Sequence, residues 1–171
     1  MPDDVKRRDL FRMTAGGLLL VQTGRTQTPV FFSKEEYLAL DELTETIIPA
    51  DDHSPGAKAA ACAAFMDRQL AETTEADDKK AWRDGMKLLE AHSDRQFGRG
   101  ITALTPQQRY ELLEPLSRAS EADAKKPLFI FFNKLKRATA FAYYSSKIGI
   151  HEEMHYKGNV PINQFVGEEP S

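Results

Sequence analysis

The chain has 171 residues, of which 41% are hydrophobic and 29% are charged, so it is suited to one globular domain with a sizeable core and is too short for a two-lobed cofactor enzyme. Its 23 basic and 26 acidic residues give a net charge of -3, which argues against nucleic-acid binding through a dense positive surface. The single cysteine, Cys62, excludes an intrachain disulfide and any metal cluster that needs two thiolates of this chain.

The N-terminal segment has the pattern of a secretion signal, in which a charged stretch precedes a short apolar one. The apolar run Met13–Thr23 contains no charged residue, and it has only about half of the roughly 20 residues that a membrane-spanning helix needs. The sequence therefore predicts no membrane span. We expect residues 1–28 to form the signal segment and residues 29–171 to form the exported domain.

The charged stretch carries the features of a twin-arginine signal. Two adjacent arginines, one spacer and two large apolar residues follow one another, namely Arg7, Arg8, Leu10 and Phe11. This pathway exports proteins that are already folded, often with a partner attached, so we expect a periplasmic location. A basic amphipathic helix is the alternative interpretation of the same residues.

Helical patterns follow in the body of the chain. Ser33 and Glu36 form a capping-box pattern before apolar residues at helical spacing. This pattern predicts a helix over 34–48, which Pro49 ends. A polar turn then leads into a second predicted helix, which contains Cys62.

Three further helices are predicted downstream. The first covers 77–91, and a second capping box, with proline at the first helical position, starts the next helix at Pro106. Pro115 is expected to kink or end that helix, and Pro127 opens the last long one. Since no segment alternates apolar and polar residues with period two, the predicted fold class is all-α, with about five helices.

Two stretches are predicted to lack regular structure. Glu72–Lys80 is rich in charge and is interpreted as a solvated turn. From about residue 145 onward, glycines and prolines recur and predict an irregular tail that is longer than a compact domain usually contains. Such a tail normally needs a surface on which to lie.

The run Phe129-Ile130-Phe131-Phe132 places four large apolar side chains almost all the way around a helix. A small domain buries one or two of them easily and all four only with difficulty. Two interpretations follow: the run belongs to a fully internal core helix, or one of its faces docks on a partner.

His151, Glu152 and His155 match the H-E-x-x-H signature of zinc proteases, in which two imidazoles hold the metal and the glutamate activates water. The extended signature has its third ligand at the position of Pro161, which offers no donor atom. A catalytic zinc normally takes three protein ligands. We therefore interpret the match as coincidental and keep a periplasmic metal-binding protein or zinc hydrolase as the alternative function.

The remaining reactive side chains are assigned structural roles. Cys62 lies on the apolar stripe of its helix and is expected to be a buried thiol. His53 is assigned to a loop and capping role, and His92 is placed just past a helix end, where the dipole favours a cation. Because the sequence contains no motif for flavin, nicotinamide, phosphate or covalent haem, we expect no cofactor in this chain.

A set of short motifs runs through most of the chain in a specific order. Besides the paired arginines, the set comprises Leu43–Asp51, Ser54–Ala57, Phe97–Gly98, Leu104–Arg109, Tyr143–Gly149 and Tyr156–Asn159. Together these motifs resemble the small subunit of membrane-associated, flavin-dependent gluconate 2-dehydrogenases, the gluconate 2-dehydrogenase subunit 3 family. The tail departs from the family pattern, because Glu168 follows Gly167 where a cysteine or a small residue is expected.

This resemblance implies a small helical subunit without catalysis of its own. Its partner would be a large flavoprotein of the glucose-methanol-choline oxidoreductase type, which binds FAD and oxidises a sugar or sugar acid, frequently together with a cytochrome c subunit. One export signal would serve the folded complex, so this chain would escort its partner. The predicted partner interface comprises Phe129, Phe131, Phe132, Tyr143, Tyr144, Tyr156 and Asn159.

Overall fold

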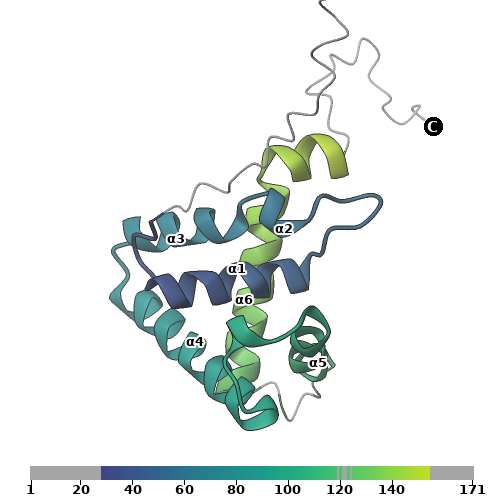
Figure 1. Ribbon diagram of the computed structural model, residues 1–171. Helices are drawn as coiled ribbons and strands as arrows, with labels where there is room; N and C mark the ends of the chain where they lie inside the picture. Colours follow the sequence, from purple (N-terminus) through teal and green to yellow (C-terminus); the bar gives the residue numbers. More distant parts are fainter. Residues whose placement is uncertain (1–27, 119, 121–122, 124, 155–171) are drawn as a thin grey trace, which may run out of the picture.

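The computed structural model describes residues 28–118, 120, 123 and 125–154. All regular elements within these ranges are helical, which confirms the predicted all-α fold class. In chain order (Figure 1) they are α1 (Lys34–Ile47), α2 (Gly56–Ala59), α3 (Cys62–Glu72), α4 (Ala76–Phe97), η1 (Ile101–Ala103), α5 (Pro106–Ser117), α6 (Pro127–Tyr144) and η2 (Ile148–Glu153). None of these helices combines the length and the apolar character that crossing a membrane requires.

Helix α6 is the axis of the domain and contacts α1, α3, α4 and α5. In Figure 1 it runs from the bottom to the top of the domain, with α1 crossing in front of it. Its buried side includes Phe131, Phe132, Leu135 and Tyr143. These side chains form one hydrophobic core together with buried leucines of α1, α4 and α5.

An aromatic cluster joins the segment before α1 to α4 and α6. The Trp82 ring of α4 packs edge-on against Phe32 and Phe131, with centroid distances of 6.3 and 5.6 Å. Phe31 packs edge-on against Phe32 at 4.7 Å. All four rings are buried, and edge-on aromatic pairs stabilise a core beyond the area that they bury. The residues just before α1 are therefore part of the core.

The buried carboxylate of Asp67 in α3 fixes the same segment. It accepts hydrogen bonds from the backbone N–H groups of Val30, Phe31 and Phe32 at 2.7, 3.0 and 2.9 Å. The Arg83 guanidinium of α4 donates to the Phe31 carbonyl oxygen at 2.8 Å and lies over the Phe31 ring. Because several donors compensate for the burial of a charge, these contacts hold the chain against α3 and α4. We call them the Asp67 clamp.

Both predicted capping boxes are present. At the start of α1, the Ser33 hydroxyl accepts from the Glu36 N–H at 3.1 Å, and the Glu36 carboxylate accepts from the Ser33 N–H at 2.9 Å. Thr105 and Gln108 form the same reciprocal pair at the start of α5, with Pro106 at its first helical position. These local patterns place two helix starts correctly because each box involves only four neighbouring residues.

The second predicted helix is divided into α2 and α3. Ala61 lies between them with φ of 54°, the only positive φ of a non-glycine residue in the described part of the chain. A left-handed alanine costs roughly 1–2 kcal/mol. This conformation ends α2 and lets α3 start in a new direction.

Helix α4 continues beyond the predicted end at residue 91. His92 consequently lies inside the helix, and its predicted position past a helix end is wrong. The helix ends at Gly98, which has φ of 68° and donates its N–H to the Asp94 carbonyl oxygen. A left-handed glycine is the usual C-terminal stop, and the polar residues before it form an exposed helix face.

Two predicted interruptions do not end a helix where expected. The stretch Glu72–Lys80 is mostly helical, because only residues 73–75 separate α3 from α4. Its charged side chains suit exposed helix faces as well as a turn. Pro115 does not end α5, which continues to Ser117. Pro115 lies in the last turn, and both Pro115 and Glu111, whose carbonyl group loses its N–H partner, are exposed residues.

The first part of the predicted irregular tail is helical. Residues 148–153 form η2, a short π-helix, and the Ser146 hydroxyl supports its start by accepting the Gly149 N–H at 3.0 Å. Gly149 is buried, and a β-carbon there would overlap the Tyr143 carbonyl group. Glycine at this position therefore permits close packing. The remainder of the tail, 155–171, lies outside the described residues.

Candidate partner-binding surface

The structure divides the predicted interface residues of α6 between core and surface. Phe131, Phe132 and Tyr143 are buried, with exposed fractions of 4%, 3% and 1%. Phe129 is partly buried against the core, whereas Tyr144 is 46% exposed. The three buried side chains hold the domain together and are not available at its surface. Other residues of α6 therefore define the face that a partner could contact.

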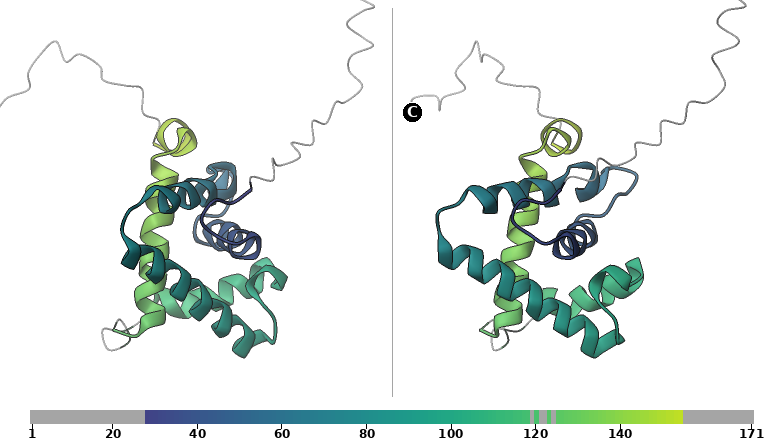
Figure 2. Two further views of the ribbon diagram at one scale, coloured as in Figure 1. Left: turned by 90° about the vertical axis from the view of Figure 1, so that its left-hand side faces the viewer. Right: turned by 60° about the vertical axis from the view of Figure 1, so that its left-hand side comes forward.

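The outward side of α6 carries Ile130, Arg137, Phe141 and Tyr144, which we call the α6 stripe. Their spacings of seven, four and three residues place them on one face of the helix. Ile130 is 55% exposed and Phe141 is 58% exposed. In the left view of Figure 2, α1 and α5 lie on one side of α6, while α3 and α4 cross it and their connection reaches beyond it on the other side. The exposed side chains of the stripe show that this face of α6 is not covered by the other described helices.

The surroundings of the stripe are aromatic and basic. The Phe141 ring lies against Phe65 of α3, with centroids 6.0 Å apart, and the Tyr144 ring packs edge-on against Tyr143 at 5.3 Å. Helix α6 contains two lysines and Arg137 but no acidic residue. Within the described residues, Arg137 forms no ion pair, whereas Lys134 pairs with Asp78 of α4. The stripe therefore combines apolar side chains with a free guanidinium.

The polar loop between α1 and α2 is held by hydrogen bonds. The Asp51 carboxylate accepts the backbone N–H groups of His53 and Ser54 at 2.8 and 2.7 Å, and these bonds lower the pKa of Asp51. The Ser54 hydroxyl lies 2.6 Å from the Tyr143 hydroxyl, a hydrogen bond that joins the loop to α6. His53 thus has the loop position that its sequence context predicts.

Glu45 closes this loop from the side of α1. Its carboxylate accepts the N–H groups of Ala50 and Lys58 at 3.0 and 2.7 Å. Gly56 has φ of 82°, and a β-carbon there would stand 2.6 Å from both the Ala50 nitrogen and a Glu45 carboxylate oxygen. Only glycine fits this combination of backbone angle and close approach. The loop therefore presents a defined shape to solvent.

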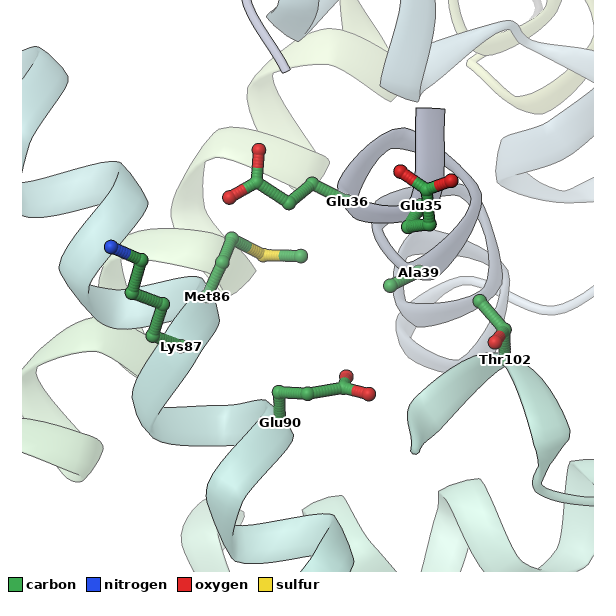
Figure 3. A pocket seen from close by; sticks show the side chains of 7 residues that line it. All are labelled: Glu35, Glu36, Ala39, Met86, Lys87, Glu90 and Thr102. Atoms are coloured by element: carbon green, nitrogen blue, oxygen red, sulfur yellow. The ribbon is translucent and has the colours of Figure 1, made fainter. Parts of the chain in front are cut away.

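A cavity of about 180 Å³ lies between α1, α4 and η1. Figure 3 shows carboxylates of Glu35, Glu36 and Glu90 around it, with the Met86 side chain between the helices. Two of these carboxylates already bind backbone groups: Glu36 belongs to the capping box of α1, and both oxygens of Glu90 lie 3.3 Å from the Ile101 nitrogen. The carboxylates of Glu36 and Glu90 at this cavity therefore serve as hydrogen-bond acceptors for nearby backbone N–H groups.

Two titratable residues have shifted pKa values with structural causes. Cys62 is fully buried, and burial raises the pKa of its thiol to about 12. The buried position of Cys62 is thus confirmed, and the raised pKa keeps its thiol protonated at neutral pH. His92 is partly buried in α4, and desolvation, together with the nearby Arg95, lowers its pKa. This environment disfavours the cation that a position past a helix end would favour.

The zinc-type signature falls only partly within the described residues. His151 is exposed and lies in η2 with Glu152, but His155 lies outside. In the part of the chain that the structure describes, no three His, Cys, Asp or Glu side chains are grouped to hold a metal ion. The coincidental match stays a prediction. Also outside the described residues are the predicted signal and tail residues Arg7, Arg8, Leu10, Phe11, Tyr156 and Asn159.

The sequence interpretation missed two buried charges that organise the domain. One is Asp67 of the clamp. The other is Arg109 of α5, which is 8% exposed, donates to the Leu104 carbonyl oxygen at 2.6 Å and pairs with Glu42 of α1 at 2.6 Å. Asp67 occupies a position of the apolar face of α3, next to Met66. A charge at such a position is the signal that could have identified a buried acceptor.

The comparison with protein families identifies the chain. Residues 34–164 match the family described as gluconate 2-dehydrogenase subunit 3, a span that begins with α1 and extends past η2. Neither a curated protein nor a solved structure gives a significant match. The family match covers well over half of the chain and agrees with the motifs that follow one another from α1 to the tail. The chain therefore belongs to the gluconate 2-dehydrogenase subunit 3 family.

Proposed function

We propose that this chain is the non-catalytic small subunit of a sugar or sugar-acid dehydrogenase, in which it binds and stabilises a large flavoprotein subunit. The observation that carries the proposal is the family match over 34–164, which includes every helix of the described domain. FAD and the oxidation of the substrate's CH–OH group would belong to the partner, of the glucose-methanol-choline type. A cytochrome c subunit would be a third member that receives the electrons.

The use of charged groups in the domain supports this proposal. The buried charges of Asp67 and Arg109 bind backbone groups and Glu42, so they stabilise the fold. Two of the three carboxylates beside the α1–α4 cavity, those of Glu36 and Glu90, likewise bind backbone N–H groups. What the domain offers outward is the α6 stripe, with large exposed apolar side chains, a feature typical of surfaces that bind other proteins.

We extend the proposal to export. Arg7 and Arg8 would direct the folded complex through the twin-arginine route, and a flavoprotein without its own signal would travel with this chain to the periplasm. The Asp67 clamp supports this arrangement, because it fastens residues 30–32 to α3 and α4 immediately after the predicted signal segment. The signal would then be attached to a folded core.

The deciding experiment is affinity purification of the full chain from the cells that make it, followed by mass spectrometry and flavin absorbance. We expect a large flavoprotein with bound FAD to co-elute in a fixed ratio. A chain that elutes alone with one bound zinc would contradict the proposal and support the metal-binding alternative. Glu152→Gln separates the two further, because it abolishes a zinc hydrolase and leaves sugar oxidation by a subunit complex unchanged.

Export is tested separately by replacing Arg7 and Arg8 with lysine. The expected result is that this chain and the flavoprotein both stay in the cytoplasm. Normal export of the flavoprotein beside the lysine variant would contradict the escort role. Cell fractionation with an antibody against each subunit measures the outcome, and a cytoplasmic enzyme serves as the fractionation control.

A further inference from the structure

We propose that the α6 stripe docks into an apolar groove of the large flavoprotein subunit and that a carboxylate in this groove pairs with Arg137. The inference rests on the proposed function and names the surface and the chemistry of its partner. It also replaces the buried members of the predicted interface, Phe131, Phe132 and Tyr143, by side chains that are accessible.

Exposed apolar area is concentrated on one face of α6. Ile130, Phe141 and Tyr144 are each between 46% and 58% exposed, and they lie within 15 residues of one helix, a length of roughly 21 Å. The other large exposed apolar side chains of the described residues are spread over separate parts of the chain, namely Val30, Leu38, Leu88, Tyr110 and Met154. Scattered apolar residues are normal, whereas a row of them marks a binding surface.

The charge of α6 differs in sign from that of the whole chain. Helix α6 carries three basic residues and no acidic one, although the whole chain has a net charge of -3. Arg137 lies midway along the stripe and forms no ion pair within the described residues, in contrast to Lys134, which pairs with Asp78. A guanidinium binds a carboxylate through two parallel hydrogen bonds. The complementary surface is therefore apolar with an acidic group near its centre.

The position of Arg137 distinguishes a protein groove from a lipid surface. Helices that lie on membranes keep their cations at the borders of a continuous apolar face. Here the guanidinium stands between Ile130 and Phe141 on the same face, where insertion into lipid would leave it without a partner. A protein groove can supply a carboxylate at that point.

Neighbouring side chains support the exposed rings of the stripe. The Phe141 ring lies against Phe65 of α3, and the Tyr144 ring packs edge-on against Tyr143. Tyr143 is in turn hydrogen-bonded to Ser54 of the α1–α2 loop at 2.6 Å. Side chains that are already held in place lose less conformational entropy on binding. The exposed rings are thus positioned to act as anchors.

The test measures the dissociation constant between the purified full chain and the purified large subunit. Phe141→Ala and Arg137→Glu are each expected to raise this constant about tenfold or more, because central aromatic and arginine anchors dominate interfaces. Leu88→Ala and Arg99→Glu are the matched controls, since both residues are exposed and lie off α6. The controls should change the constant by no more than about twofold. Arg137→Gln should fall between wild type and Arg137→Glu.

Each outcome has a definite meaning. Failure of the wild-type chain to bind any flavoprotein contradicts the proposed function itself. Wild-type binding that the stripe variants leave unchanged overturns the present inference alone. A lipid-binding result would also overturn the inference. In that case the wild type binds vesicles of anionic lipid, Arg137→Glu does not, and both bind the flavoprotein equally well. Circular dichroism checks folding, and the exposed Arg137 keeps the test valid if Phe141→Ala is destabilised.

Discussion

Gly85 of α4 lies directly against the ring of Phe131 of α6, and a β-carbon at Gly85 would overlap that ring. Both residues are buried, and Trp82 packs edge-on against the same ring. Helix α4 thus provides both Gly85, which leaves room for the Phe131 ring, and Trp82, whose indole packs against it. These two residues fix the position of the ring. This glycine allows two helices of the core to approach closely.

Gly85→Ala is therefore expected to destabilise the domain by roughly 1–3 kcal/mol through overpacking. The sign is diagnostic, since glycine to alanine within a helix normally stabilises by about 1 kcal/mol. Thermal unfolding followed by circular dichroism measures the change. Phe131→Leu makes the facing side chain smaller, so Gly85→Ala should cost less in that background. A higher melting temperature for Gly85→Ala alone would contradict the close approach.

Asp67→Asn tests the clamp before α1. An asparagine offers one oxygen acceptor where the carboxylate offers two, so at least one N–H group of residues 30–32 loses its partner. We expect a loss of roughly 1–3 kcal/mol in unfolding free energy and faster hydrogen exchange of these amides. Asp94→Asn, at an exposed position of α4, is the control. Unchanged exchange at residues 30–32 in Asp67→Asn would rule out the clamp as their anchor.

A double-mutant cycle over Ser54→Ala and Tyr143→Phe measures the bond between the loop and α6. The hydroxyl oxygens are 2.6 Å apart and the contact is partly buried, so we expect a coupling free energy of roughly 1 kcal/mol. Tyr110→Phe removes a comparable hydroxyl at an exposed position and should leave stability nearly unchanged. Additive effects of the two substitutions would show that the bond contributes nothing.

The buried thiol of Cys62 makes the stability of the domain depend on pH. Its thiol has a pKa of about 12 in the folded chain against 9.0 as the ordinary value. Above pH 9 the unfolded chain releases the thiol proton and the folded chain keeps it. The free energy of unfolding therefore falls as pH rises above 9, and Cys62 makes no pH-dependent contribution below pH 9. Between pH 8 and 11, the unfolding free energy of Cys62→Ala should therefore depend less on pH than that of the wild type.

The same thiol should resist labelling in the native state. A disulfide reagent at pH 8 is expected to react with Cys62 only after unfolding in urea, because burial excludes the reagent and keeps the thiol protonated. Equal labelling rates with and without urea would contradict the buried position.

Features that depend on a few neighbouring residues could be predicted from the sequence. The capping boxes at Ser33 and Thr105 are present because their hydrogen bonds close within three residues. The end of α4 was accessible in the same way, since Gly98 is a local stop signal. The sequence interpretation instead ends the helix near residue 91, where the regular spacing of apolar residues stops but no glycine or proline is present.

Features that depend on contacts distant in the sequence could not be predicted in this way. Asp67 binds amides 35 to 37 residues away, and helical spacing does not reveal such a partner. Among the four residues of the apolar run, only the packing of α1, α3 and α4 around α6 decides that Phe131 is buried and Ile130 is exposed. Three of the residues that the sequence interpretation names for the interface, Phe131, Phe132 and Tyr143, therefore lie on the inner side of α6, whereas Tyr144 is exposed.

The Asp67 clamp also determines how the domain would respond to a pull on its N-terminal end. The three hydrogen bonds to Asp67 and the bond from Arg83 fall on adjacent residues, so they carry the load together instead of opening one after another. Phe31 and Phe32 add resistance because their rings would have to leave the core. Tension is then shared by α3 and α4 before it reaches the first turn of α1. A pull transmitted to residue 28 would therefore have to break the contacts of residues 30–32 with two helices before it could unwind a third.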